Sequence, residues 1–178
     1  MNLGDLELIP FGDKRLNEAP ARFDYEKDDA ELVSKLLHEK CNMLNGAGLS
    51  ANQVGLDMQV FTMVYGEEFK RTLFNPLLVS VSEETCIEKE GCLSFPGLWL
   101  SLSRPSEATF QYTDVEGKEV IETYTSVAAR IALHEYDHML GKNFTMRASK
   151  FKLDRAIKGL DKKVKRFKRN VKGVRNVR

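Results

Sequence analysis

Two histidines and a glutamate lie close together in the segment 133–141, whose sequence is LHEYDHMLG. On a helix, residues i and i+4 share one face about 5–6 Å apart, so His134 and His138 can both bind one metal ion. Glu135, directly after the first histidine, is then placed to take a proton from water on that metal. The alternative is an ordinary polar helix face with two hydrogen-bonded histidines.

A metal site of this kind needs a third protein ligand, and the sequence after the motif does not offer one. Many proteases with this motif use a later glutamate, or a histidine six residues beyond the second histidine. No glutamate follows Glu135, and Phe144 stands at the place of that histidine, although Gly141 matches the extended protease pattern. This absence argues against a protease that cuts internal peptide bonds.

The best upstream candidate is Cys92, in the segment EGCLSFPG at residues 90–97. Its neighbouring glycines indicate an irregular loop, in which a thiol can reach helix-borne histidines. One cysteine and two histidines leave a fourth position open, as in catalytic sites, whereas structural sites are usually closed by four protein ligands. A lone buried cysteine is the alternative, and Cys86, in a charged segment without glycine, is the weaker candidate. The alternative to an enzyme is a nucleic-acid-binding module in which these cysteine and histidine residues hold a structural zinc ion. Such a site has no role for Glu135, which argues against this alternative.

A third segment, GAGLSANQVG at residues 46–55, contains chemistry-bearing residues of another kind. Its glycines permit close approach of the backbone to a ligand or strand, and Gln53 offers an amide donor. A plain connection between a helix and a strand explains the same residues.

Taken in this order, the three segments resemble the signature motifs of the peptide deformylase family. The family patterns are Gly-x-Gly-Leu-Ala-Ala-x-Gln, Glu-Gly-Cys-Leu-Ser and Gln-His-Glu-x-Asp-His. Here they read GAGLSANQ at 46–53, EGCLS at 90–94 and LHEYDH at 133–138, and the resemblance extends from about Ile9 to Gly141. It implies a hydrolase that removes the N-formyl group from the N-terminal formyl-methionine of newly made polypeptides and releases formate.

The resemblance also implies a cofactor and residue roles. One divalent metal ion is expected, Fe²⁺ in the cell, with Zn²⁺, Ni²⁺ or Co²⁺ able to substitute. The expected ligands are Cys92, His134 and His138. Hydroxide on the metal attacks the formyl carbonyl, with Glu135 as general base and then acid. The Gln53 side chain and the Leu93 backbone N–H are expected to stabilise the oxygen that becomes negative.

Methionine's unbranched side chain requires an apolar pocket. The residues expected to bind substrate are Gly48, Leu49, Gly91 and Ile131. Glu90 is expected to support the cysteine loop through hydrogen bonds, and Asp137 to be structural because it lies on a different helix face from the histidines.

Three positions depart from what the family pattern leads one to expect. Ser50 replaces the first alanine and adds a hydroxyl near Gln53. Leu133 replaces the glutamine before the first histidine, which questions the support of the metal site and the rate, not the reaction type. Trp99 stands where many bacterial relatives carry an arginine near the substrate entrance, which leaves the preference for later substrate residues open.

Composition indicates one globular domain of 178 residues, 42% hydrophobic and 30% charged, without an apolar run that could cross a membrane. The first residues show no secretory signal, and three cysteines are too few for a disulfide framework, so a monomer in the cytoplasm is expected. Residues 149–178 hold 13 of the 27 Lys and Arg but 2 of the 26 Asp and Glu. We therefore divide the chain into a catalytic part, 1–148, and a basic amphipathic C-terminal helix of the same domain, 149–178, whose charge suits contact with a polyanion. The family resemblance implies that this polyanion is ribosomal RNA; the alternative is a solvated helix that packs on the body through its apolar stripe.

The pattern of apolar residues predicts the elements that position these residues. Helices are expected at about 29–44, at 125–141 around the two histidines, and along the tail, whose apolar stripe runs Leu153, Ile157, Leu160, Val164, Phe167, Val171 and Val174. Strands are expected at 58–65 and 72–81, and a hairpin at 107–125 with its turn at Glu116–Gly117. This order predicts an α+β fold with mainly antiparallel sheets packed around the central helix that carries the histidines, plus a long C-terminal helix.

Overall fold

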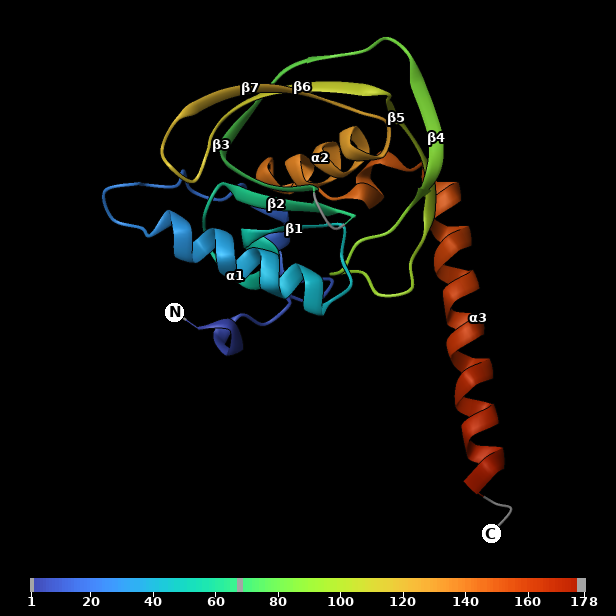
Figure 1. Ribbon diagram of the computed structural model, residues 1–178. Helices are drawn as coiled ribbons and strands as arrows, with labels where there is room; N and C mark the ends of the chain where they lie inside the picture. Colours follow the sequence, from blue (N-terminus) through green and yellow to red (C-terminus); the bar gives the residue numbers. More distant parts are fainter. Residues whose placement is uncertain (1, 67–68, 176–178) are drawn as a thin grey trace.

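The computed structural model describes the backbone of residues 2–66 and 69–175, and side chains as far as residue 169. The described elements follow along the chain in this order (Figure 1): η1 (Leu3–Asp5), η2 (Lys14–Asn17), α1 (Ala30–Met43), β1 (Gly48–Ser50), η3 (Ala51–Val54), β2 (Val60–Tyr65), β3 (Phe69–Val81), β4 (Thr85–Glu90), β5 (Leu100–Pro105), β6 (Glu107–Thr113), β7 (Glu119–Thr125), α2 (Ser126–Met139), η4 (Phe144–Arg147) and α3 (Lys150–Arg175).

The strands of the described residues form two antiparallel sheets. One has five strands in the order β1-β2-β3-β6-β7, and β4 pairs with β5 in a separate two-stranded sheet. Helix α2 lies in the middle of the molecule, between the β6–β7 side and the β1–β2 side of the large sheet, while α1 lies outside β1 and β2 (Figure 1). The predicted α+β fold around the central helix is therefore confirmed.

Both helices of the core begin and end as their sequences predict. The Asp29 side chain accepts a hydrogen bond from the Leu32 N–H, which caps the start of α1. Asn45, directly after the helix, has a positive φ of 52° and turns the chain towards β1. Gly141 ends α2 with a φ of 65°, and a Cβ there would lie 2.7 Å from the Ala19 backbone nitrogen. Gly141 is thus required by the fold, not by a protease motif.

Strands β1, β4 and β5 were not predicted from the sequence. β1 has three residues, too few to show a period. β4 has the sequence TCIEKE and is largely exposed, so its charged residues do not show the alternation of apolar and polar residues that predicts a strand. β5 does alternate, with Leu100, Leu102 and Arg104 facing inward, and the inward arginine is the sign of a buried charge partner.

The predicted C-terminal helix is present, but its apolar stripe packs on the body only at its beginning. Leu153, Ala156 and Leu160 contact a hydrophobic cluster that contains Phe95, Leu98, Leu100, Leu102 and Phe144. Further along, Val164 and Phe167 are 42% and 70% exposed, where the helix projects away from the body (Figure 1). The side chains of Val171 and Val174 lie outside the described residues. Within the described chain, no helix has the length and apolar character to span a membrane.

Candidate metal centre

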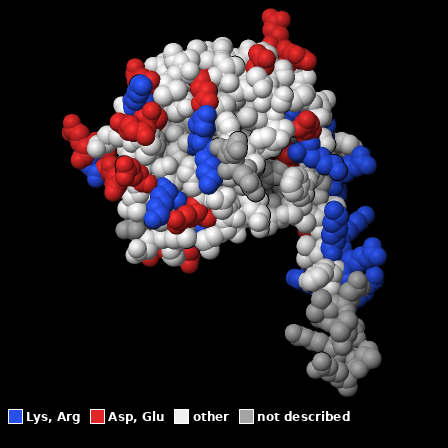
Figure 2. Space-filling view, in the orientation of Figure 1, with Lys and Arg blue, Asp and Glu red and all other residues white. Residues whose placement is uncertain are grey.

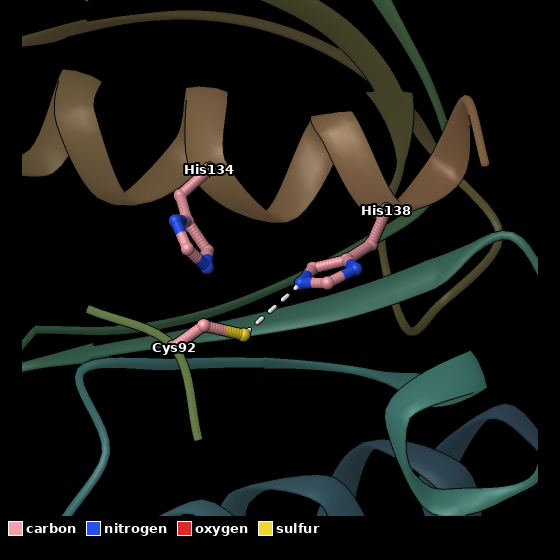
Figure 3. A group of neighbouring side chains, drawn as sticks. All are labelled: Cys92, His134 and His138. Atoms are coloured by element: carbon pink, nitrogen blue, oxygen red, sulfur yellow. Dashed lines mark hydrogen bonds between the residues drawn. The ribbon is translucent and has the colours of Figure 1, made fainter. Parts of the chain in front are cut away.

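The three predicted ligands converge from two elements. His134 and His138 extend from the same face of α2, and Cys92 lies in the loop directly after β4, which ends at Glu90 (Figure 3). Their ligand atoms all lie within 4.8 Å of one another, and Cys92 Sγ is 3.5 Å from His138 Nε2. The loop brings the sulfur to the helix although 41 residues separate Cys92 from His134 in the chain. Three such donors with space on one side match a catalytic metal site.

The electrostatic setting of the two histidines differs, although both are buried. Burial lowers the pKa of His134, but its interactions with Cys92 and Glu90 outweigh burial and raise the pKa to about 10. Burial and the charge on His134 lower the pKa of His138 to about 3, so its ring is neutral. The site therefore favours one positive charge among these groups, and a divalent cation can take the place of the proton. The donor set fits a metal ion.

Glu90 binds His134 on the side of the ring that faces away from the other two ligands. The Nδ1 of His134 lies 2.7 Å from Glu90 Oε1, which leaves Nε2 directed towards Cys92 and His138. Burial alone would raise the pKa of Glu90, but the hydrogen bonds from Arg104 and His134 hold it well below its usual range. Glu90 was expected to support the cysteine loop, but its side chain binds Arg104, Arg130 and His134. A carboxylate bound to a ligating imidazole fixes the ring's tautomer and orientation.

Glu135 is 4% exposed, and its side chain makes no hydrogen bond or ion pair with the described residues. Its Oε2 has no hydrogen-bond partner among the described residues. Burial raises the pKa of Glu135 to about 7, which is the range suited to a group that takes and returns a proton near neutral pH.

Gln53 lies in the short helix η3 and points into the same site. Its Nε2 donates to Cys92 Sγ and to Ser94 Oγ, each at 3.2 Å. Its Oε1 accepts from both the backbone N–H and the hydroxyl of Ser50, at 3.0 and 2.9 Å. The hydroxyl that distinguishes Ser50 from the family alanine has one proton for two acceptors, Asn52 Oδ1 at 2.8 Å and Gln53 Oε1 at 2.9 Å, so it gives the Gln53 amide a shared hydrogen bond. The Leu93 N–H, the second predicted donor, makes no hydrogen bond within the described chain.

A pocket of about 440 Å³ opens next to these groups, a size that suits a small ligand. Of the predicted substrate-binding residues, Gly48, Gly91 and Ile131 line it. Leu49 is not among the residues that line the pocket: its side chain is fully buried in the cluster beneath α1, and its contact with substrate stays a prediction. Successive residues of a strand face opposite ways, so Gly48 faces Glu135 and Leu49 faces the core. Trp99 borders the pocket and is 62% exposed.

Asp137 and Arg104 form a buried ion pair that sequence reasoning found only in part. Asp137, predicted to be structural, accepts from Arg104 Nη1 at 2.8 Å and from Arg147. Arg104, 1% exposed, also binds Glu90, so one guanidinium joins the helix to the strand that leads to the metal loop. The sequence signal for Arg104 was its inward position in the alternating strand β5.

The remaining cysteine and histidine candidates lie elsewhere. Cys86 is on β4, with its sulfur 3.3 Å from an Arg130 nitrogen, and belongs to no described cluster of metal-ligating atoms. His38 is hydrogen-bonded to Thr62 and Thr72. This placement favours Cys92 over Cys86 as the third ligand.

Two buried histidines with a half-buried cysteine, a carboxylate beside them and a pocket at their open side define the class of protein: a hydrolase that uses a metal ion. A model of the polypeptide deformylase family matches residues 6–154. The chain belongs to this family, whose enzymes remove the N-formyl group from newly made polypeptides with the help of a metal ion.

Individual relatives agree with this membership. The chain is 37% identical over 121 residues to the peptide deformylase of Pseudothermotoga lettingae, which covers 67% of this chain and 70% of that protein. It is 32% identical to the peptide deformylase of Alkalilimnicola ehrlichii over 94% of this chain and 96% of the relative. Among solved structures, the peptide deformylase of Synechococcus elongatus in complex with actinonin has a TM-score of 0.82 at 28% identity, over 89% and 87% of the two chains. The Ehrlichia chaffeensis enzyme has a TM-score of 0.78 at 33% identity, over 90% and 97%.

Proposed function

We propose that this chain removes the formyl group of formyl-methionine on nascent polypeptides, with Glu135 as the proton-transferring residue. The observation that carries the proposal is the free Oε2 of a buried Glu135 beside the pocket and the three candidate ligands. The ligands of the metal are Cys92, His134 and His138. This reaction is a co-translational step of N-terminal methionine processing.

The chain's own residues divide the work as follows. A bound metal ion supplies a Lewis acid and lowers the pKa of water, so that hydroxide is available near neutral pH. Glu135 accepts the proton of that water and passes it to the methionine nitrogen as the formyl carbon–nitrogen bond breaks. Gln53 Nε2 and the Leu93 N–H donate hydrogen bonds to the formyl oxygen as it becomes negative.

The methionine side chain lies in the pocket against Leu93 and Ile131, and the peptide passes Gly48 and Gly91. Glycine at these two places lets two side chains of the site lie close to the backbone: a Cβ at Gly91 would lie 3.1 Å from the Trp99 ring, and a Cβ at Gly48 would lie 2.5 Å from Glu135 Oε1. We propose Fe²⁺ as the metal in the cell. Zn²⁺, Ni²⁺ and Co²⁺ suit the same donors, and the availability of each metal decides which one this ligand set binds.

Formate release from formyl-Met-Ala-Ser by Fe²⁺- or Ni²⁺-loaded protein tests the activity. Cys92→Ala is expected to abolish both metal retention and turnover. Cys86→Ala is the matched control, since Cys86 lies outside the cluster, and it is expected to retain both. Equal turnover by wild type and Cys92→Ala would refute the ligand assignment.

We also propose that residues 149–178 form a basic extension of the catalytic domain that contacts ribosomal RNA. Lys and Arg side chains gather on the described part of the projecting α3, whereas acidic and basic side chains are interspersed on the body (Figure 2). Asp161 is the one acidic residue among 161–178. Such a helix attracts a polyanion electrostatically, and a cytoplasmic monomer is the form we expect to bind.

Ribosome co-sedimentation measures this contact. Binding is expected to fall steeply between about 50 and 200 mM salt, because phosphate contacts release counterions, and to be lost on deletion of residues 161–178. Binding that depends on neither salt nor these residues would exclude the tail as the contact.

A further inference from the structure

Arg130 is a buried cation on α2, one helical turn before His134. Only 7% of its surface is exposed. With His134 and His138 it occupies positions i, i+4 and i+8, so the three side chains leave the same face of the helix. A buried guanidinium is expensive unless directed partners compensate its lost hydration, so its contacts must account for it.

The guanidinium of Arg130 joins three elements. Nη1 donates to Glu90 Oε2 and to the Leu102 carbonyl, both at 3.2 Å, and Nη2 donates to the Cys86 carbonyl at 2.8 Å. Nε lies 3.5 Å from a Glu88 carboxylate oxygen without forming a hydrogen bond. Arg130 therefore fastens α2 to β4 and β5 at the level of the metal loop.

Charge neutralisation does not explain this contact. Arg104, on β5, already engages both oxygens of the Glu90 carboxylate, Oε2 through Nε at 2.9 Å and Oε1 through Nη2. Arg130 adds a donor to Oε2 from α2, the helix that carries His134, while Oε1 faces His134 Nδ1 at 2.7 Å. The added hydrogen bond ties the carboxylate to that helix, so it resists movement of Glu90 relative to His134.

We propose that Arg130 is a positioning residue of the metal centre. It acts through Glu90: by tying that carboxylate to α2, it keeps the Nδ1–H of His134 hydrogen-bonded to Glu90 and the Nε2 of the ring turned towards the other two ligands. The proposal rests on the proposed function of His134 as a ligand. Outer partners of ligating histidines typically contribute about 10- to 100-fold to metal affinity or activity. Arg130 is not such a partner itself but binds Glu90, which is the partner of His134.

The substitutions must separate the hydrogen bond from charge and from volume. Arg130→Met retains an unbranched stem of similar length, which matters because Arg130 also lines the pocket. Arg130→Lys retains the charge but replaces the planar fork by a single ammonium group. Arg71→Met is the matched control, because Arg71 forms an ion pair with Glu122, at 3.3 Å, and does not border the pocket.

The test measures the Co²⁺ dissociation constant of the metal-free protein by competition with a chelator, together with the visible absorption spectrum of the Co²⁺ form. Arg130→Met is expected to raise the dissociation constant about 10-fold or more and to change the spectrum, and Arg130→Lys to do so by about half as much on a logarithmic scale. Arg71→Met is expected to match wild type. Melting temperatures of the metal-free forms identify a variant that fails to fold; if Arg130→Met does, Arg130→Lys decides.

Wild-type affinity and an unchanged spectrum in the folded Arg130 variant would overturn the proposal. Cys92→Ala keeps this outcome distinct from failure of the metal site itself. If Cys92→Ala binds Co²⁺ as tightly as wild type, the ligand assignment fails; if it loses Co²⁺ while the Arg130 variant keeps it, only the role of Arg130 fails.

Discussion

Gly48 lies directly against the side chain of Glu135: a Cβ at residue 48 would come within 2.5 Å of Oε1 and 2.9 Å of two carbons. Gly48→Ala must therefore displace the carboxylate from the site. We expect kcat for formyl-Met-Ala-Ser to fall by about 100-fold or more, because a shift of about 1 Å in a reacting group has effects of this size. Steady-state kinetics, with melting temperature as the check on folding, measure it.

Gly4→Ala is the matched control, because nothing lies within 4 Å of a Cβ at that position. Its kinetics are expected to equal those of wild type. Full activity of Gly48→Ala would mean that Glu135 works from another position than the one seen here.

Gln53 and Ser50 should differ strongly in importance. Gln53→Ala removes a proposed donor to the formyl oxygen, and loss of one such donor typically lowers kcat by about 100- to 1,000-fold. Ser50→Ala removes one of the two hydrogen bonds that hold Gln53 Oε1, while the backbone N–H of residue 50 remains. We expect its kcat to fall less than about 10-fold. Comparable losses in the two variants would contradict the assigned roles.

Glu135 should make the stability of the metal-free protein depend on pH. Because burial raises its pKa from 4.5 to about 7, the folded state holds a proton that the unfolded state releases. Its contribution is full below about pH 4.5 and is lost as the pH rises through about 7. Glu135→Gln escapes this loss, so its unfolding free energy should gain on wild type by up to about 3 kcal/mol between pH 4.5 and 8.

Urea unfolding of both chelator-treated proteins at pH 5, 6 and 8 measures this difference. Taking the difference between variant and wild type removes the titrating groups that do not interact with Glu135. A constant difference across this range would show that Glu135 titrates as an ordinary carboxyl.

Leu133 should resist replacement by the glutamine of the family pattern. Its side chain is 4% exposed in the cluster between α2 and the large sheet, and it is the Leu133 carbonyl that accepts from Arg104 Nη1. Leu133→Gln buries an amide among apolar groups, and we expect it to lower the unfolding free energy by about 2 kcal/mol or more. Leu140→Gln, at a 44% exposed position, is the control and should lie within about 0.5 kcal/mol of wild type. A Leu133→Gln protein of wild-type stability would refute this account.

Leu160 should matter for the body and Phe167 should not. Leu160 packs against the pocket loop, with its Cδ1 3.0 Å from where a Cβ of Gly97 would lie. Leu160→Asp is expected to lower the melting temperature by about 5 °C or more. Phe167→Asp, seven residues on along the same stripe and 70% exposed, should leave it within about 1 °C. Equal shifts would mean that α3 is not anchored at Leu160.

The residues of the histidine motif could be found from the sequence because the local geometry of a helix fixes their positions relative to one another. The four-residue spacing of His134 and His138 places them on one helix face whatever the rest of the fold does. Cys92 could be identified as a ligand because no suitable residue lies downstream of the histidines and because its segment resembles a family motif. The helix ends at Asn45 and Gly141 were equally local, since a turn residue decides each of them.

The remaining features depend on which elements meet in space. Neither Arg104 nor Arg130 belongs to a motif, and their link to His134 arises only once β4 and β5 pack beside α2. The orientation of Leu49 depends on the phase of a strand three residues long. In α3 the apolar stripe continues beyond the surface that it contacts, because periodicity shows the face of a helix but not where its partner ends.

The uneven distribution of charge makes the molecule an electric dipole. Ten more acidic than basic residues lie in 1–148, and eleven more basic than acidic residues lie in 149–178. A strongly negative surface therefore exerts a torque as well as an attraction: it draws α3 forward and turns the body away. At physiological ionic strength salt screens such interactions beyond about 8–10 Å, so ionic strength should change the orientation in which the molecule approaches a negative surface as well as the strength of the attraction.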